Sequence, residues 1–158
     1  MSHSGKRPPT FFSQTALYAL RAMVHLSLQD ASTLVPAKEL AEETNIPRSY
    51  VSKIMRQLVT AELVRSHRGH HGGFQLACPM EDISVLKILS AVDSSEESIH
   101  QCGFGWEQCS NDEPCPLHET WGDLRSRFLE WAETTTLSRI RHYNMEKRFF
   151  YLTKSTST

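Results

Sequence analysis

Three stretches between residues 13 and 61 repeat apolar side chains every three or four positions, which is the period of helices with one buried face. The first begins after Ser13, a good N-cap, and ends at the polar residues from Asp30. The second follows Pro36, which suits a first helical turn, and the third spans about residues 48–61. The positions expected to face the core are Ala16, Leu20, Met23, Val24, Leu28, Leu40, Ala41, Val51, Ile54, Met55 and Leu58.

The second and third stretches are joined by a short connection at Ile46 and Pro47, which is the pattern of a helix-turn-helix. The outer face of the third carries charges and hydrogen-bond donors, as contact with bases and phosphates requires. A solvated helix face has a similar composition, so this pattern alone leaves both interpretations open. The residues that we expect to contact DNA from this helix are Arg48, Ser49, Tyr50, Lys53 and Arg56.

A β-hairpin is predicted directly after the helix-turn-helix, where residues 63–66 and 74–76 flank a glycine-rich turn. In that position a hairpin forms a wing. Arg68 at its tip is placed to enter a minor groove, and the glycines let the backbone approach phosphate. The histidines His67, His70 and His71 could bind a metal, but we interpret them as polar residues of an exposed turn that can approach phosphate.

Two more helices are indicated towards the C-terminus. The first has Val85, Ile88, Leu89 and Val92 as its apolar side. The second carries the most regular stripe of the chain, with a/d spacing over two heptads: Leu117, Trp121, Leu124, Phe128 and Trp131. Packing on the chain's own core would produce the same stripe. Its large rings and its position outside the winged-helix unit favour a dimer interface instead.

These elements predict a mainly α fold: a winged helix-turn-helix with a two-stranded β wing, followed by a long dimerisation helix. We expect a disordered extension at 1–11, the DNA-binding unit at 12–93, a loop and the dimerisation helix at 94–143, and a flexible tail at 144–158. Thr136 is expected to cap a short helix over 137–143.

Charge and hydropathy narrow the class of function. Residues 1–77 carry a net charge of +4 and residues 78–158 carry −5, which suggests that the first half meets a polyanion. No apolar run is long enough to cross a membrane, and the first ten residues do not resemble a signal peptide. We therefore expect a cytoplasmic protein with no membrane partner.

Three of the four cysteines, Cys102, Cys109 and Cys115, lie with His118 in a segment rich in residues that favour turns. A helix is expected to begin at Pro116, which would place Cys115 and His118 on one helical face. Thiolates and imidazole are ligands for iron–sulfur clusters and for zinc. Cys78 lies apart and is interpreted as a small, buried or half-buried residue.

Three interpretations of this segment stay open on spacing alone: an iron–sulfur cluster, a structural Cys3His zinc site, and three unligated thiols. Structural zinc sites usually contain closer cysteine pairs than the six- and five-residue gaps found here. In a reducing compartment, clustered cysteines are more often ligands or sensors than disulfides. Enzymatic thiol chemistry is disfavoured, because neither a CxxC pair nor a phosphate-binding loop accompanies the cysteines.

Residues 12–143 resemble the IscR/NsrR-type (Rrf family) transcription regulators of bacteria. The resemblance is carried by the segments TALYALRAM, IPRSYVSKIMRQL, SHRGHHGGFQLA, ISVLKILSAVD and CPLHETW. It implies a winged-helix homodimer that binds a palindromic operator in double-stranded DNA. It also implies an iron–sulfur cluster that senses iron–sulfur supply, redox state or nitric oxide, and it implies no enzymatic activity.

The same resemblance assigns ligands. Cys102, Cys109 and Cys115 match the three thiolates of the family, and His118 matches the histidine that completes the cluster in the iron–sulfur-assembly regulators. Nitric-oxide sensors use an acidic residue near the first helix, but residues 14–18 contain no Asp or Glu. A [2Fe–2S] cluster is expected over a [4Fe–4S] cluster, although the first gap is one residue longer than is common in the family. The alternative function is that of a zinc-bound or cluster-free repressor. A thiol oxidoreductase is a further, less favoured alternative.

Overall fold

A computed structural model describes residues 12–92, 102, 105–107 and 109–147. Its elements, in chain order, are α1 (Gln14–Leu28), α2 (Ala37–Thr44), α3 (Arg48–Thr60), β1 (Val64–His67), β2 (Gly73–Leu76), the 3-10 helix η1 (Met80–Asp82), α4 (Val85–Val92), α6 (His118–Thr134) and α7 (Leu137–Lys147). The expectations for residues 1–11, for the start of the loop at 94–101 and for 148–158 lie outside the described residues.

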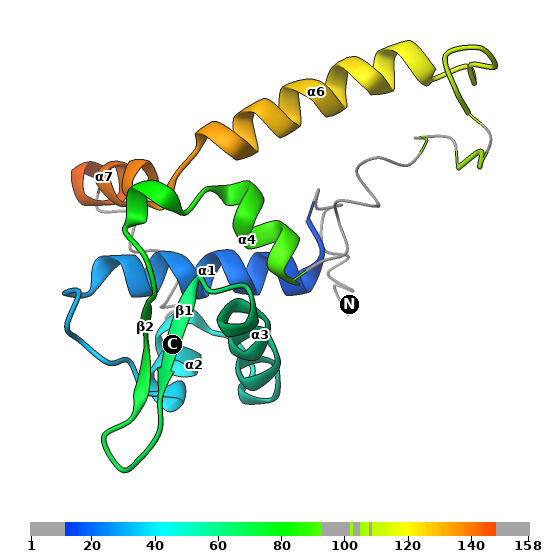
Figure 1. Cartoon of the computed structure of the whole chain (residues 1–158). Helices are drawn as coiled ribbons and strands as arrows, with labels where there is room; N and C mark the ends of the chain where they lie inside the picture. Colours follow the sequence, from blue (N-terminus) through cyan, green and yellow to red (C-terminus); the bar gives the residue numbers. More distant parts are fainter. Residues whose placement is uncertain (1–11, 93–101, 103–104, 108, 148–158) are drawn as a thin grey trace, which may run out of the picture.

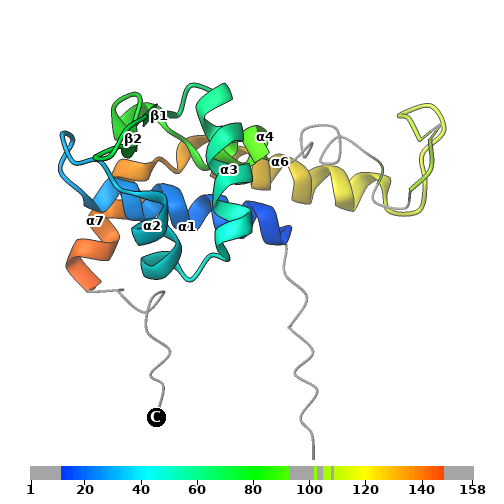
Figure 2. The same cartoon turned by 90° about the horizontal axis from the view of Figure 1, so that it is seen from below.

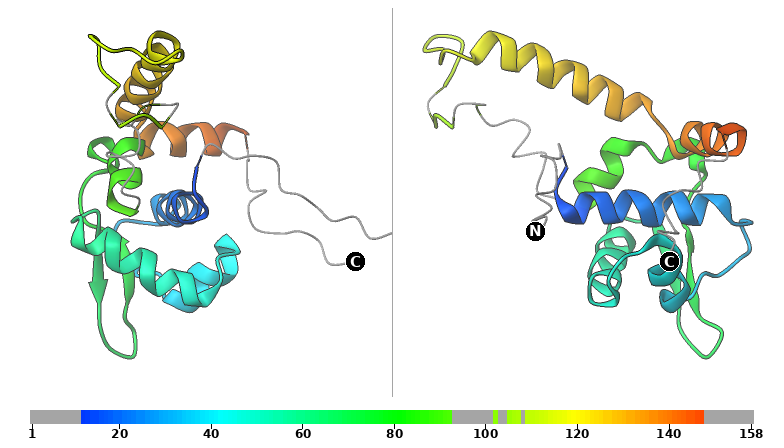
Figure 3. Two further views of the ribbon diagram at one scale, coloured as in Figure 1. Left: turned by 90° about the vertical axis from the view of Figure 1, so that its right-hand side faces the viewer. Right: turned by 180° about the vertical axis from the view of Figure 1, so that it is seen from behind.

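Helix α1 runs through the middle of the molecule, with α2, α3 and the hairpin on one side and α4, α6 and α7 on the other (Figures 1 and 3). The Ser13 hydroxyl accepts a hydrogen bond of 3.0 Å from the Ala16 amide, which confirms the predicted N-cap. The predicted apolar stripe was only partly right. Leu20, Val24 and Leu28 are only partly buried, whereas the buried residues of α1 are Ala16, Tyr18, Ala19, Ala22, Met23, Leu26 and Ser27. Because elements pack on both sides, the buried face is wider than one stripe.

Helices α2 and α3 form the expected helix-turn-helix. Every residue that was predicted to face the core from them is buried. Asn45 ends α2 in the left-handed conformation with φ 53°, and Ile46 is buried in the connection. Pro36 is the N-cap of α2, one position before the helix begins at Ala37.

The predicted wing is present as an antiparallel pair in which Val64 lies opposite Leu76 and His67 opposite Gly73. Two backbone hydrogen bonds of 2.9 Å between Val35 and Phe74 fasten the wing to the segment that follows α1. A Cβ atom on Gly73 would lie 2.7 Å from the Val35 oxygen. This glycine is therefore required by the packing of the wing on the body.

The C-terminal helices depart from expectation at two boundaries. Helix α6 begins at His118, after the expected start at Pro116, and α7 continues to Lys147, beyond the expected end at 143. The flexible tail therefore does not begin at 144. A bridge between Ser84 and Thr136 joins the start of α4 to the α6–α7 connection, and the Thr136 hydroxyl accepts a bond of 3.4 Å from the Arg139 amide, as predicted for a cap.

Only the C-terminal part of α6 packs on the body, and the rest extends away from it with the cysteine segment at its far end (Figures 1 and 2). Ala132 is the only buried residue of α6. A helix of 17 residues is about 25 Å long, so α6 holds the cysteine segment well away from α7.

We predict that Gly73→Ala destabilises the protein by about 1–3 kcal/mol, because its methyl group would meet the Val35 backbone, which cannot rotate away. Gly122→Ala is the matched control, since nothing lies within 4 Å of a Cβ atom there. In the helix α6 this change should be neutral or stabilising by up to about 1 kcal/mol. Urea unfolding measures both, and equal stability of Gly73→Ala and wild type would contradict the packing described here.

Candidate metal centre and nucleic-acid interface

The cysteine segment brings its four candidate ligands together. The Sγ atoms of Cys102, Cys109 and Cys115 lie within 4.8 Å of one another. Two pairs are closer: Cys102 Sγ is 3.3 Å from Cys115 Sγ, and Cys109 Sγ is 3.1 Å from His118 Nδ1. The sequence had suggested that Cys115 and His118 share a helical face. In the structure each of them instead lies against a cysteine from earlier in the segment.

Turns in the backbone produce this convergence. Gly105 has φ 79°, and its amide donates a 2.9 Å hydrogen bond to the Cys102 carbonyl. The His118 amide donates to the Cys115 carbonyl at 3.0 Å, which closes a turn immediately before α6. The positive φ is the conformation that glycine adopts without strain. Gly105 and the turn before α6 thus bring sulfur atoms that are far apart in the sequence together near the start of the helix.

Burial of Cys115 and its hydrogen bond with Cys102 raise the pKa of the Cys115 thiol to about 11. The thiol is therefore protonated at neutral pH when no metal is bound. The metal ligand is the thiolate, so metal binding at this position has to displace a proton.

The donors fit a soft metal. Two thiolates on one tetrahedral metal at about 2.3 Å lie roughly 3.8 Å apart. The three Sγ atoms lie within 4.8 Å of one another, so they are near enough to share a metal. Three sulfur donors with one imidazole suit either an iron–sulfur cluster or a zinc ion. Among the described residues, no other group of three His, Cys, Asp or Glu side chains converges in this way.

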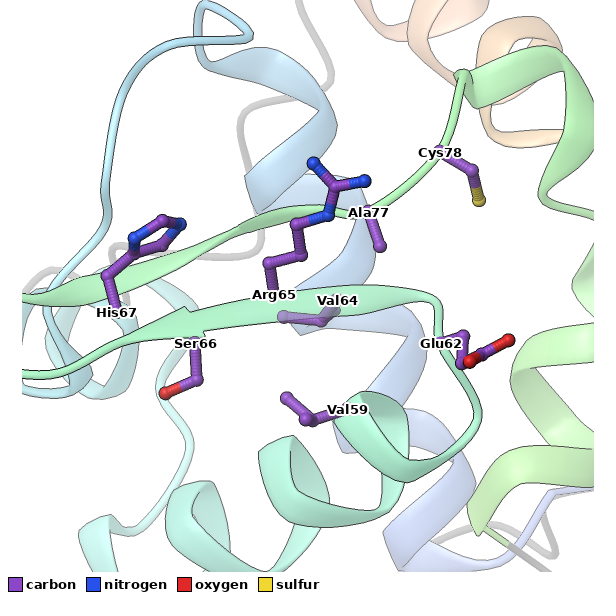
Figure 4. Close-up of a pocket in the computed structure, with 8 residues that line it drawn as sticks. All are labelled: Val59, Glu62, Val64, Arg65, Ser66, His67, Ala77 and Cys78. Carbon is purple, nitrogen blue, oxygen red and sulfur yellow. The ribbon is translucent and has the colours of Figure 1, made fainter.

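Cys78 takes no part in this group. It lies two residues after the end of β2, where it lines a groove of about 680 Å³ with Val59 of α3 and with Arg65 and His67 of β1 (Figure 4). Cys78 is half-buried, and burial raises the pKa of its thiol. These properties agree with its interpretation as a small structural residue.

The expected DNA contacts lie on one side of the molecule. Arg48, Ser49, Tyr50, Lys53 and Arg56 are exposed on α3, and Arg68 is exposed in the wing turn. The wing turn and α3 both lie on the side of α1 opposite α6 (Figures 1 and 3). A basic helix and a basic hairpin turn that share a side are suited to a duplex, with the helix in the major groove.

Two of the residues expected to contact DNA, Tyr50 and Arg48, are themselves in contact with neighbouring side chains. The Tyr50 ring meets the Tyr18 ring edge-on at 5.5 Å, and the Arg21 guanidinium lies 5.8 Å from the centre of the Tyr18 ring. Arg48 is 3.5 Å from Glu42, but both side chains are well exposed, so this ion pair is weak and can yield to phosphate. The role of Tyr18 was not evident from the sequence, where it had no place in the predicted stripe of α1.

Gln57 of α3 does not point to the exposed face of its helix. Its side chain is half-buried, and Nε2 donates a 3.3 Å hydrogen bond to the carbonyl oxygen of Val92 at the end of α4. Gln57 therefore links the third helix to the end of α4, beyond which the chain continues to the cysteine segment.

The stripe on α6 is largely exposed. Leu117, Leu124 and Trp131 are 43%, 47% and 46% exposed, while Trp121 and Phe128 are half-buried. Phe128 packs on the core, with its ring 6.1 Å from that of Phe12. The Trp131 ring lies 5.6 Å from the Phe128 ring and 6.5 Å from the Phe12 ring. Packing within the chain thus accounts for Phe128 and for part of Trp131, but Leu117 and Leu124 remain 43% and 47% exposed. Within the described residues, no helix is long and apolar enough to span a membrane.

Comparison with known proteins places these features in a family. Residues 12–142 match the model of the Rrf2 family, described as iron-dependent transcriptional regulators. An HTH-type transcriptional regulator of Mycobacterium tuberculosis is 36% identical over 128 residues, which cover 81% of this chain and 79% of that protein. The HTH-type transcriptional regulator IscR of Vibrio vulnificus is 32% identical over 127 residues, covering 80% and 74%.

Solved structures share the fold. CymR, the global cysteine regulator of B. subtilis, superposes with a TM-score of 0.70 at 23% identity, over 85% of this chain and 98% of that one. IscR of T. potens superposes with a TM-score of 0.69 at 23% identity, over 89% and 92%. These matches confirm the mainly helical winged helix-turn-helix with a two-stranded wing. The chain therefore belongs to the Rrf2 family of transcriptional regulators, which bind DNA and are not enzymes.

Proposed function

We propose that the chain is a homodimeric regulator whose binding to a palindromic operator depends on an iron–sulfur cluster held by Cys102, Cys109, Cys115 and His118. The observation that carries this proposal is the convergence of three sulfur atoms within 4.8 Å, with His118 Nδ1 3.1 Å from one of them. A [2Fe–2S] cluster is the form that we expect. When bound, such a cluster supplies a centre that responds to iron–sulfur supply, redox state or nitric oxide.

A zinc-bound or cluster-free repressor remains the second candidate, because three thiols and one imidazole also suit a single tetrahedral zinc ion. The thiol oxidoreductase is set aside, since the family consists of transcriptional regulators. A regulator of genomic operators acts where the genomic DNA lies, so we propose the bacterial cytoplasm as its site of action.

The chain offers a physical connection from the cysteine segment to the DNA-binding face. The cysteine segment lies between the end of α4 and the start of α6. The C-terminal part of α6 packs on α4. Gln57 of α3, the helix proposed to contact DNA, donates a hydrogen bond to the carbonyl oxygen of Val92, the last residue of α4. Ordering of the cysteine segment can change operator affinity only if it favours one arrangement of these helices over another.

The first prediction concerns the DNA face. Arg68→Ala should weaken operator binding by about 1–3 kcal/mol if the guanidinium reads a base or a narrow groove. Lys53→Ala should weaken binding to all sequences and flatten the dependence of affinity on salt, because one phosphate contact is lost. Lys87→Ala on α4 removes the same charge outside this face and should leave affinity and salt dependence unchanged. Binding to an operator selected from genomic DNA, titrated at several salt concentrations, provides the measurement. Wild-type behaviour of both variants would exclude this assignment of the DNA face.

The second prediction concerns the dimer. Leu124 is exposed in the single chain, so Leu124→Asp should not disturb folding but should place a charge in the proposed seam, at a cost of several kcal/mol. Ser126→Asp, on another face of α6, is the control and should remain dimeric. In sedimentation velocity, Leu124→Asp should be monomeric, whereas the wild type and Ser126→Asp should be dimeric. A dimeric Leu124→Asp protein would contradict an interface on this stripe. Phe128→Asp is less informative, because Phe128 also packs on the core.

The third prediction concerns the cluster and its effect on DNA. Anaerobically purified wild type should contain iron and acid-labile sulfide and show sulfur-to-iron charge-transfer absorption. Cys109→Ala should lose all three, because it removes a central donor, whereas Cys78→Ala should keep them. Zinc without sulfide in the wild type would favour the second candidate.

Operator affinity then tests the sensor function. At one salt concentration, the cluster-loaded wild type should differ from both the cluster-free wild type and Cys109→Ala by about 5–150-fold, which corresponds to a coupling of roughly 1–3 kcal/mol. The two cluster-free proteins should agree with each other, and Cys78→Ala should follow the wild type in both states. Equal affinity of all three forms would leave a DNA-binding protein without a cluster-dependent switch.

A further inference from the structure

The ring of His118 is held at both nitrogen atoms. Nδ1 lies 3.1 Å from Cys109 Sγ, and Nε2 lies 2.9 Å from the side-chain oxygen Oδ1 of Asn111. Asn111 is exposed and stands in a short turn that the Ser110 and Glu113 hydrogen bonds close: the Ser110 amide donates to the Glu113 carbonyl at 3.3 Å, and the Glu113 amide donates to the Ser110 hydroxyl at 3.1 Å. The turn holds Asn111 against Nε2, the ring nitrogen that does not contact Cys109.

The partner of Nε2 decides which nitrogen can bind a metal. A neutral imidazole carries one N–H, and its other nitrogen carries the lone pair. The amide oxygen of Asn111 only accepts hydrogen bonds, so Nε2 must carry the proton to bind it. Nδ1 then presents its lone pair towards Cys109, where it can accept from the thiol of the metal-free protein.

We infer that Asn111 is a positioning residue: it keeps His118 in the Nε2–H tautomer and thereby directs Nδ1 to the metal. This inference rests on the proposed function only in naming the metal site, since the tautomer is a property of the metal-free chain. Histidines that bind metals commonly donate their second N–H to such a partner, which fixes both tautomer and ring orientation. An uncharged amide does this without adding negative charge to the ligand.

The first experiment reads the tautomer directly in the metal-free, reduced protein. Long-range ¹H–¹⁵N correlation spectra of ¹⁵N-histidine-labelled protein, recorded at a pH where imidazole is neutral, distinguish the protonated nitrogen from the bare one. His118→Gln assigns the ring by the loss of its signals. Wild type and Asn111→Asp, which keeps an acceptor oxygen, should show the Nε2–H form. Asn111→Leu, of similar size without an acceptor, should show a mixture of tautomers. An Nδ1–H ring in wild type, or an unchanged ring in Asn111→Leu, would overturn the inference.

The second experiment measures what the tautomer does for metal binding, with Co²⁺ as a spectroscopic probe. Asn111→Leu should bind Co²⁺ about 10–100-fold more weakly than wild type, and Asn111→Asp should restore the affinity. Asp112→Leu is the matched control, because this exposed neighbour in the same turn should leave affinity unchanged. If Asn111→Leu binds Co²⁺ like wild type, Asn111 does not position the ligand.

The two experiments separate the inference from the proposed function. A wild-type protein that binds neither Co²⁺ nor an iron–sulfur cluster would refute the proposed function. The tautomer spectra would still decide whether Asn111 orients His118. Conversely, a cluster-loaded wild type with an unchanged tautomer in Asn111→Leu would uphold the proposed function and remove Asn111 from it.

Discussion

Burial of α1 is the interaction on which the rest of the structure depends. Helices α2, α3, α4 and α7 and strand β2 all pack on this helix. Ala16, Ala19 and Ala22 are almost completely buried, and their small side chains let the neighbouring helices approach closely. The position of α3, the helix that we propose to contact DNA, relative to the C-terminal helices is therefore determined by packing around α1. A close-packed centre has low compressibility, so a displacement of the helices on one side of α1 can be transmitted to those on the other side.

The wing depends on a second, local constraint. Its hairpin has only two strands, and an isolated two-stranded hairpin is marginally stable in water. The backbone at Val35 adds a third extended segment to the hairpin through its hydrogen bonds with Phe74. Gly73 leaves room for this segment because it has no side chain. Gly69 has a φ of 115°, a conformation that side-chain-bearing residues rarely adopt, while a Cβ atom on Gly72 would lie 2.2 Å from the His67 oxygen. The glycines of the wing thus serve its own folding first, whatever they contribute beside DNA.

The cysteine segment is held together by different forces from the body. Apart from Cys115, its described residues are exposed or half-buried, so it lacks a hydrophobic core of its own. Its order rests on a few backbone turns and on contacts among the donors themselves. Binding free energy of a ligand at such a place is also free energy of ordering the chain. This is the physical reason for placing the proposed switch there and not in the well-packed body.

The sequence by itself determined the helices, the wing and the set of candidate ligands, because apolar periodicity, turn-forming residues and cysteine clustering are local properties. The inward residues of α3 and α4 were right, since each helix buries one stripe. The face of α1 was partly wrong, because its period reports a helix but not how many neighbours surround it. Only the tertiary structure decided that Gln57 turns to Val92, that Asn111 meets His118, and that Leu124 stays exposed while Phe128 packs inward. Each of these depends on where a second segment lies in space, which no spacing along the chain specifies.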